Sequence, residues 1–169
     1  MYVPVSKLVN GAFYLLNIAH QRIHPFLGFL NTLPEYKGRT GAYFSIRSQS
    51  TGFVLATAAV GVPPVEKMEK YSNYSLEKGK RLFKHRKHLT SYESRNEANN
   101  KFAGAVKVGS LYILSCSGFS PDDADTLFCL DVSLSGQVLE NNSGEINRII
   151  KAADIADLKE SYDVYFFGY

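Results

Sequence analysis

The sequence predicts an α+β fold in which helices flank a central antiparallel sheet of about five strands. The main observation is a unit that occurs twice, over residues 41–64 and 102–130. In each copy an apolar run turns at a glycine, a second apolar run stops at another glycine, and a proline then begins a helix. Amphipathic segments towards both ends of the chain supply further helices, which can cover the faces of the sheet.

Length and composition limit the class of protein. A chain of 169 residues with 45% apolar residues is long enough for one domain, residues 1–169, with a buried core. The net charge of +3 is too small to indicate a nucleic-acid partner, and no apolar run approaches the ~20 residues that cross a membrane. Because there is no signal-peptide pattern and the only cysteines are Cys116 and Cys129, we expect free thiols and a cytoplasmic location.

Apolar residues repeat at helical spacing from Ser6 to about Ile23, so we expect the first helix there, with Ser6 as its N-cap. Pro25 should end this helix, because proline lacks the backbone N–H that a helix interior needs. The following residues, 24–40, are expected to form a loop. Its segment 26–30 is too apolar to be merely solvated, and we expect it to cover a core edge or a subunit contact.

Turn signals divide the middle of the chain into two hairpins and a helix. The four strands of these hairpins are expected at residues 43–48, 53–60, 103–108 and 111–117. The second helix is expected from about Val65 to Lys87, because Pro63 and Pro64 suit its first turn. A polar loop, residues 90–101, separates this helix from the second hairpin.

The third helix has a strong start signal. Ser120 suits the N-cap, Pro121 suits the first position, and the acidic residues that follow suit the positive end of a helix. Gly136 should end this helix, and a last helix is expected over residues 145–159. The aromatic tail, residues 161–169, is expected to form either a short strand or a docking arm.

The densest charge cluster, residues 78–88, contains no acidic residue. Such a cluster is typical of a phosphate or nucleic-acid site, but also of a solvated helix end, and we favour the helix end because no aromatic platform is evident beside it. Within the cluster, His85 and His88 are spaced i, i+3, so both imidazoles can ligate a metal or haem iron from one helix face. The alternative is that both are simply exposed, since no third His or Cys completes a zinc set.

The remaining candidate motifs have structural interpretations. Asp122, Asp123 and Asp125 lack the register of a calcium loop, and capping of the helix explains the first two. Ser117 and Gly118 end a strand with small side chains, which admit either a close ligand or a close helix. The sequence contains no phosphate loop, dinucleotide motif or recognisable nucleophile–base pair. We therefore expect a binding protein rather than an enzyme.

One segment, GAVKVGSLYILSCSGFSPDDADTLF, resembles the closing block of the haem-binding and haem-degrading-like family, which includes the GlcG type, the HbpS type and the C-terminal domain of PduO-type adenosyltransferases. The matching residues are Gly104, Ala105, Ser117, Gly118 and Asp123. Upstream, the segment SLEKG resembles the family's lysine-bearing helix, and the lysine is Lys78. The similarity covers about residues 5–135, and the C-terminal helix and aromatic tail, residues 136–169, have no counterpart in it.

The resemblance implies a profilin-like α/β/α sandwich that forms homo-oligomers and, in some members, binds haem in a cleft beside the helix that carries the lysine. We therefore expect a small-molecule-binding or sensing module, with haem as the leading ligand. His85 or His88 would ligate the iron. Lys78 or Arg81 would pair with a propionate. The other expected ligand contacts are Tyr71, Phe83, Ser117 and Gly118.

Two alternative functions stay open at this point. The first is a ligand-free protein-interaction or scaffold module, in which the apolar segment 26–30 and the tail 162–169 are buried at a subunit or partner contact. The second is an enzyme of the haem-degrading kind. The resemblance is compatible with such an enzyme, but no catalytic constellation in the sequence supports it.

Overall fold

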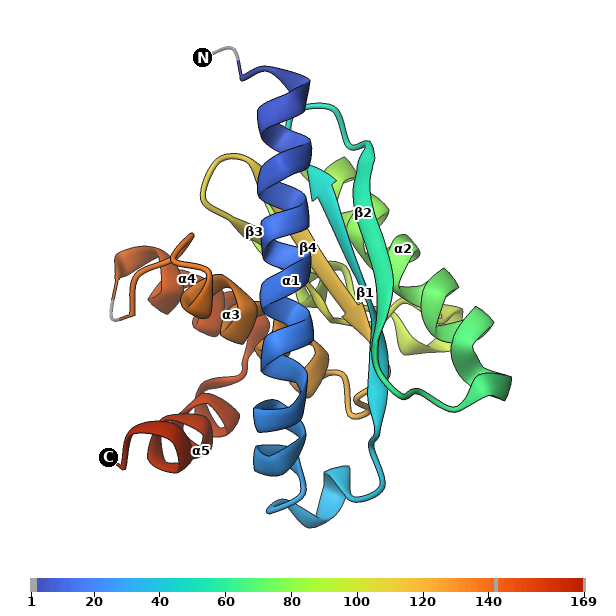
Figure 1. Ribbon diagram of the computed structural model, residues 1–169, viewed down its shortest axis with the longest axis vertical. Helices are drawn as coiled ribbons and strands as arrows, with labels where there is room; N and C mark the ends of the chain where they lie inside the picture. The colour runs from blue at the N-terminus through green and yellow to red at the C-terminus, as the bar shows by residue number, and fades with distance from the viewer. Residues whose placement is uncertain (1–2, 142, 169) are drawn as a thin grey trace.

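The structure is a computed structural model that describes residues 3–141 and 143–168. Its helices are α1 (Val5–Leu30), α2 (Met68–Lys84), α3 (Asp123–Ser135), α4 (Gly144–Ala153) and α5 (Ala156–Phe167). Its strands are β1 (Gly41–Ser48), β2 (Val54–Gly61), β3 (Ala105–Val108) and β4 (Tyr112–Ser117), paired antiparallel in the order β2-β1-β4-β3. Helices α1 and α3 cover one face of the sheet and α2 covers the other (Figure 1). The predicted α+β class with a central antiparallel sheet is confirmed.

The central strand β1 separates two kinds of packing. Phe44 and Ile46 point to the face that α1 and α3 cover, where they are fully buried in the main core. Ser45 and Arg47 point to α2: the Ser45 hydroxyl lies 2.9 Å from that of Ser75, and Arg47 donates to a backbone carbonyl of α2 at 2.9 Å. Because successive strand residues alternate between faces, one strand supplies an apolar core on one side and a polar layer on the other.

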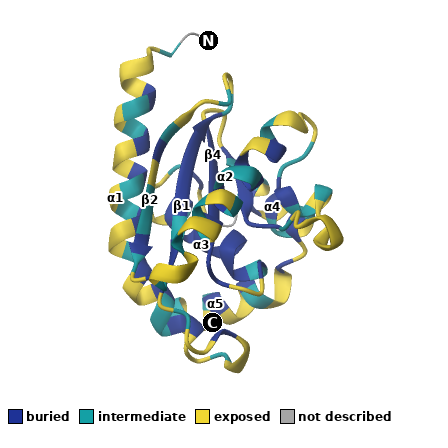
Figure 2. Ribbon diagram, turned by 90° about the vertical axis from the view of Figure 1, so that its right-hand side faces the viewer, coloured by how far each residue is buried: buried dark blue, intermediate teal, exposed yellow. Residues whose placement is uncertain are grey.

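The structure overturns the predicted end of the first helix. Helix α1 continues through Pro25, so segment 26–30 is helical and not a loop, and the helix buries one side while it exposes the other (Figure 2). Phe26 and Phe29 are at most 1% exposed, and the Phe26 ring packs on that of Phe128 with centroids 5.0 Å apart. A proline inside a helix costs about 3 kcal/mol, and burial of two phenylalanine side chains, at roughly 1.5–3 kcal/mol each, offsets that cost.

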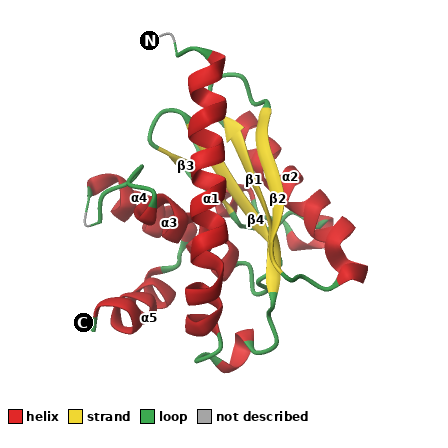
Figure 3. Cartoon of the chain, viewed as in Figure 1, coloured by secondary structure: helices red, strands yellow, loops and turns green. Residues whose placement is uncertain are grey.

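The C-terminal part of the chain also differs from the prediction. In place of one helix over residues 145–159 and a strand or arm over 161–169, the chain forms α4 and α5 (Figure 3). Asp154 ends α4 in a left-handed conformation with φ 56°. The predicted fifth strand is wrong, since the described part of the tail is helical and the described residues form a sheet of four strands. Tyr169 lies outside the described residues.

A buried polar triad holds α5 against α1 and α3. Asp131 of α3 is fully buried and accepts hydrogen bonds from Arg22 of α1, at 2.9 and 3.0 Å, and from the Tyr162 hydroxyl. Burial and the neighbouring carboxylate raise the pKa of the Tyr162 phenol, which therefore stays a proton donor. The Tyr162 ring packs on Phe29 with centroids 5.7 Å apart. Segment 26–30 and the tail thus cover each other within one chain, while Val164 and Tyr165 of the tail are exposed. The scaffold function stays a prediction.

The cap residues of α1 and α3 agree only in part with those predicted from the sequence. Gly136 follows the last residue of α3, as predicted. The N-cap of α1 is Pro4 and not Ser6, and the N-cap of α3 is Asp122 and not Ser120. Neither Pro4 nor Asp122 makes a side-chain cap hydrogen bond. Among the described helices, none combines the length and the apolar character that a membrane span requires.

We predict that Tyr162→Phe lowers the free energy of unfolding by about 1.5–3 kcal/mol, the range for hydrogen bonds to charged groups. The substitution removes the hydroxyl donor from Asp131 and keeps the ring. Urea denaturation followed by circular dichroism measures the change. The matched control is Tyr165→Phe on the same helix, whose side chain is 47% exposed and whose loss should change stability by less than about 0.5 kcal/mol. Equal effects of the two substitutions would contradict the role of the Tyr162 hydroxyl.

Candidate functional site

A cleft of about 640 Å³ lies on the side of the sheet that α2 covers. Helix α2 and the turn before it form one wall, with side chains from Lys67 to Lys78. The loop before β3 forms the second wall, with Arg95 and Phe102 among its residues. The segment that joins β4 to α3, residues 117–122, closes the end of the cleft.

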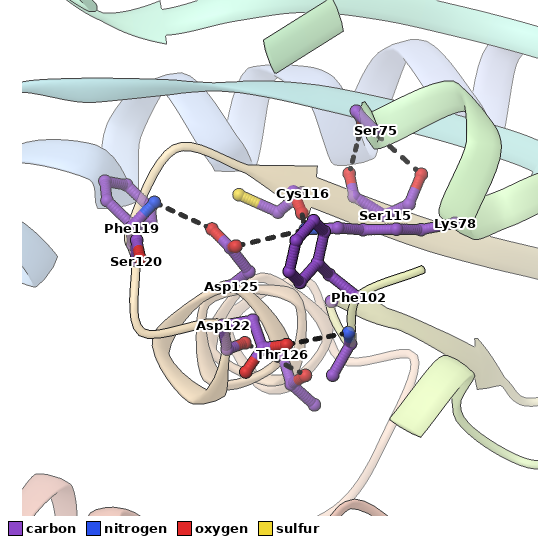
Figure 4. Close-up of polar contacts among 12 residues, drawn as sticks. Ser75, Lys78, Phe102, Ser115, Cys116, Phe119, Ser120, Asp122, Asp125 and Thr126 are labelled. Atoms are coloured by element: carbon purple, nitrogen blue, oxygen red, sulfur yellow. Dashed lines mark hydrogen bonds and ion pairs between the residues drawn. The ribbon is translucent and has the colours of Figure 1, made fainter. Parts of the chain in front are cut away.

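A buried ion pair forms the floor of the cleft (Figure 4). The Lys78 ammonium donates to the Cys116 carbonyl at 2.8 Å and lies 3.1 Å from a carboxylate oxygen of Asp125. The other Asp125 oxygen accepts the Phe119 backbone N–H at 2.9 Å. Burial raises the pKa of the Asp125 carboxyl, while Lys78 and the Phe119 N–H oppose that rise. The pair joins α2 to α3, and each charge neutralises the other.

Two glycines near the cleft allow close approaches: Gly104 to the ion pair, and Gly118 to β1. Gly104 has φ 133°, and a Cβ there would lie 2.7 Å from the Lys78 nitrogen. Gly118 has φ 143°, and a Cβ there would lie 2.7 Å from the Cα of Ala42. Both glycines belong to the residues that carry the family resemblance. The requirement at both positions is conformational and steric: Gly104 makes room for the buried lysine, and Gly118 makes room for β1.

Asp122 fixes the second wall of the cleft. Its carboxylate accepts the Ala103 backbone N–H at 2.9 Å and lies 3.2 Å from the Arg95 guanidinium. The sequence predicts that this aspartate caps the helix. In the structure its side chain instead connects the loop before β3 to the start of α3. Ser120, the other residue expected to cap, offers its carbonyl to the Arg39 guanidinium at 2.6 and 2.9 Å.

The rim of the cleft combines positive charge with aromatic rings. Arg39, Lys67 and Lys70 line the cleft, and among the described residues none of the three makes an ion pair. Beside them, the rings of Tyr74 and Phe102 meet edge to face with centroids 5.4 Å apart. Cations attract acidic groups and aromatic rings pack on flat apolar ones. The rim therefore has the chemistry to hold a ligand that is both anionic and aromatic.

Four of the predicted ligand residues meet in this cleft: Tyr71, Lys78, Ser117 and Gly118. Burial raises the pKa of the Tyr71 phenol, which favours its neutral form. Lys78 is only 2% exposed and is held by Asp125, so its charge is already compensated before any ligand binds.

The other predicted residues lie at the far end of α2. Arg81 and His85 line a separate, open cavity of about 350 Å³. Arg81 is 7% exposed, and its guanidinium donates to the Ser91 carbonyl at 2.8 Å, to Phe102 O at 2.5 Å and to Glu77. These contacts hold the loop before β3 on α2. Phe83 is half-buried against the small apolar cluster under α2.

The two histidines do not share a helix face, which corrects the sequence prediction. Helix α2 ends at Lys84 and not at Lys87, so His85 is its C-cap and His88 lies beyond it. Their rings stack with centroids 4.6 Å apart. Residues 3–141 and 143–168 contain no group of three or more His, Cys, Asp or Glu that could hold a metal ion. Iron ligation by either histidine stays a prediction.

Sequence reasoning missed most of the rim. Together with Tyr71, which was predicted, Lys67, Lys70 and Tyr74 occupy positions i, i+3, i+4 and i+7, and such spacings indicate one helix face. This wall could therefore have been found. Asp125 could also have been suspected, because a charge inside an otherwise buried helix calls for a partner. Arg39 and Phe102 come from loops, and only the tertiary structure brings them to the cleft.

Comparisons with known proteins found no similar sequence or structure. No protein-family model matches the sequence, no curated protein matches it, and no solved structure matches the chain. The function is therefore argued from the geometry of the cleft.

We predict strong energetic coupling between Lys78 and Asp125. Lys78→Met and Asp125→Leu should each lower the free energy of unfolding by about 3–5 kcal/mol, because each leaves a buried charge without its partner. The double variant should lose much less than the sum, since apolar residues often replace a buried ion pair at little cost. Urea denaturation of the four proteins gives the coupling energy. Additive losses would show that the two charges do not stabilise each other.

Proposed function

We propose that the protein is a small-molecule-binding or sensing module whose ligand lies in the cleft beside α2. The observation that carries this proposal is the set of three cations without carboxylate partners, Arg39, Lys67 and Lys70, next to the aromatic pair Tyr74 and Phe102. The volume of the cleft, about 640 Å³, falls within the usual range for small-molecule sites.

Haem is the first ligand to test, because it joins two carboxylates to a flat ring. Lys67 and Lys70 would hold the propionates, and Tyr74 and Phe102 would pack on the ring. Bound haem would supply redox or gas-binding chemistry at its iron. The described lining of the cleft contains no histidine, so the donor set fits the periphery of haem better than its iron. Ligation by His85 or His88 would place haem at the other end of α2 instead.

Binding is a better proposal than catalysis for this cleft. The titratable groups at its floor, Lys78 and Asp125, already satisfy each other. A general acid or base needs a proton that it can exchange with a substrate, and this buried pair is committed to the contact between α2 and α3. Enzymatic activity of the haem-degrading kind stays a minor alternative.

Two finer expectations are also part of the proposal. The helix–hairpin–helix–hairpin–helix order, with helices on both faces of an antiparallel sheet, supports a profilin-like α/β/α sandwich. The two cysteines, Cys116 and Cys129, are free and fully buried, which supports a reducing, cytoplasmic environment.

The test is a titration with two probes: hemin, followed by its Soret absorbance, and metal-free protoporphyrin IX, followed by fluorescence. We expect Lys67→Gln/Lys70→Gln to weaken binding of both probes about tenfold, at roughly 0.7 kcal/mol for each lost charge pair. The matched control is Lys80→Gln/Lys84→Gln, which removes the same charge from exposed positions of α2 that line the other cavity. It should leave both affinities unchanged.

A third variant, His85→Ala/His88→Ala, locates the iron. If hemin binding depends on these histidines and protoporphyrin binding does not, the iron is ligated at the C-terminal end of α2 and the cleft is not the haem site. If neither probe saturates, haem is the wrong ligand. If Lys67→Gln/Lys70→Gln and Lys80→Gln/Lys84→Gln weaken binding equally, the affinity depends on the net charge of the protein and not on contacts in the cleft.

A further inference from the structure

The two edge strands of the sheet, β3 and β2, differ in how far other segments of the chain cover them. The edge strand β3 is only four residues long, and the preceding loop covers it: Thr90 bridges to Val106, and the Lys107 N–H donates to the Leu89 carbonyl at 2.9 Å. The opposite edge strand, β2, is eight residues long, pairs with β1 on its inner side, and has no bridge on its outer side among the described residues. Figure 1 shows β2 as the outermost strand, with β1 as its neighbour.

Apart from one bulge near its start, the β2 edge also lacks the devices that usually prevent pairing with another chain. Edge strands are commonly protected by charged side chains, internal proline or a covering loop. The sequence from Gly52 to Val65 contains no charged residue, and its prolines, Pro63 and Pro64, come after the strand. One bulge, at Leu55, interrupts the pairing with β1, which leaves 56–61 as a regular edge.

Exposed apolar side chains lie at both ends of this strand. Phe53 and Val54 precede its regular part and are 72% and 41% exposed, and Val62 and Val65 follow it and are 75% and 81% exposed. In an antiparallel pair of identical strands, the start of one strand lies beside the end of the other. The apolar groups before the strand in one copy would therefore meet those after the strand in the second copy.

From this asymmetry we propose that β2 pairs with β2 of a second copy of this chain, so that two sheets join into one across a two-fold axis. A two-fold axis across an antiparallel pair places one residue opposite its own copy, so Ala58 of one chain would lie opposite Ala58 of the other, and Val54 opposite Val62. A two-fold contact needs a surface that is complementary to itself. This edge meets that condition for three reasons. Backbone N–H and C=O groups alternate along it, and it carries no charged side chain. The apolar side chains at its start can also pack on those at the end of an antiparallel copy. The contact is independent of the ligand cleft proposed above.

The test is the mass of the purified chain in solution, measured by sedimentation equilibrium over a range of concentrations. We expect the wild type to approach twice the mass of one chain, and Val54→Lys/Val62→Lys to remain at the mass of one chain, because the pairing would bring lysines of the two copies together. The control variant is Val5→Lys/Val164→Lys, which adds the same charge at exposed valines of α1 and α5 and leaves β2 itself unchanged. It should form dimers like the wild type.

Hydrogen–deuterium exchange of the same proteins shows which segment is covered. Amides of residues 56–61 should become more protected as the wild-type concentration rises and should not do so in Val54→Lys/Val62→Lys. Thermal melting of each variant confirms that it is folded. A monomeric wild type at every concentration would overturn the proposal. So would a dimer that persists in Val54→Lys/Val62→Lys, or whose protected amides lie outside β2.

Discussion

The buried ion pair between Lys78 and Asp125 is the contact on which the rest of the structure depends. Helices α2 and α3 cover opposite faces of the sheet, and the pair links them beside the end of β4. Two buried charges are tolerated only when each is satisfied, so the backbone around them is constrained. Gly104 leaves room for the pair, and the Cys116 carbonyl and Phe119 N–H complete its hydrogen bonds.

The floor and the rim of the cleft differ in charge because of this pair. The floor is electrically neutral, because Lys78 and Asp125 compensate each other. The positive character of the cleft comes from its rim, where Arg39, Lys67 and Lys70 have no carboxylate partners among the described residues. Substitutions at the rim can therefore change the ligand without disturbing the contact between the two helices, whereas substitutions at the floor affect stability first.

Local signals predicted the fold better than they predicted the site. Both hairpins and the glycine that ends α3 were evident, because turn and cap chemistry depends on neighbouring residues. The continuation of α1 through Pro25 was not evident, because it depends on Phe26 packing against Phe128, a residue far along the chain. Of the residues expected to contact a ligand, Tyr71 and Lys78 line the cleft, whereas His85 follows the end of α2 and lines a separate cavity.

By itself, the sequence determined the mixed class, the two hairpins and the helix that follows each of them, because periodicity and turn residues act over a few positions. Only the tertiary structure decided which charges are paired and which line the rim of the cleft. Lys78 and Lys70 have the same chemistry and lie on one helix, yet Lys78 is buried against Asp125 and Lys70 is exposed at the rim. That difference arises from the positions of α3 and the loop before β3, which are long-range contacts that no local pattern encodes.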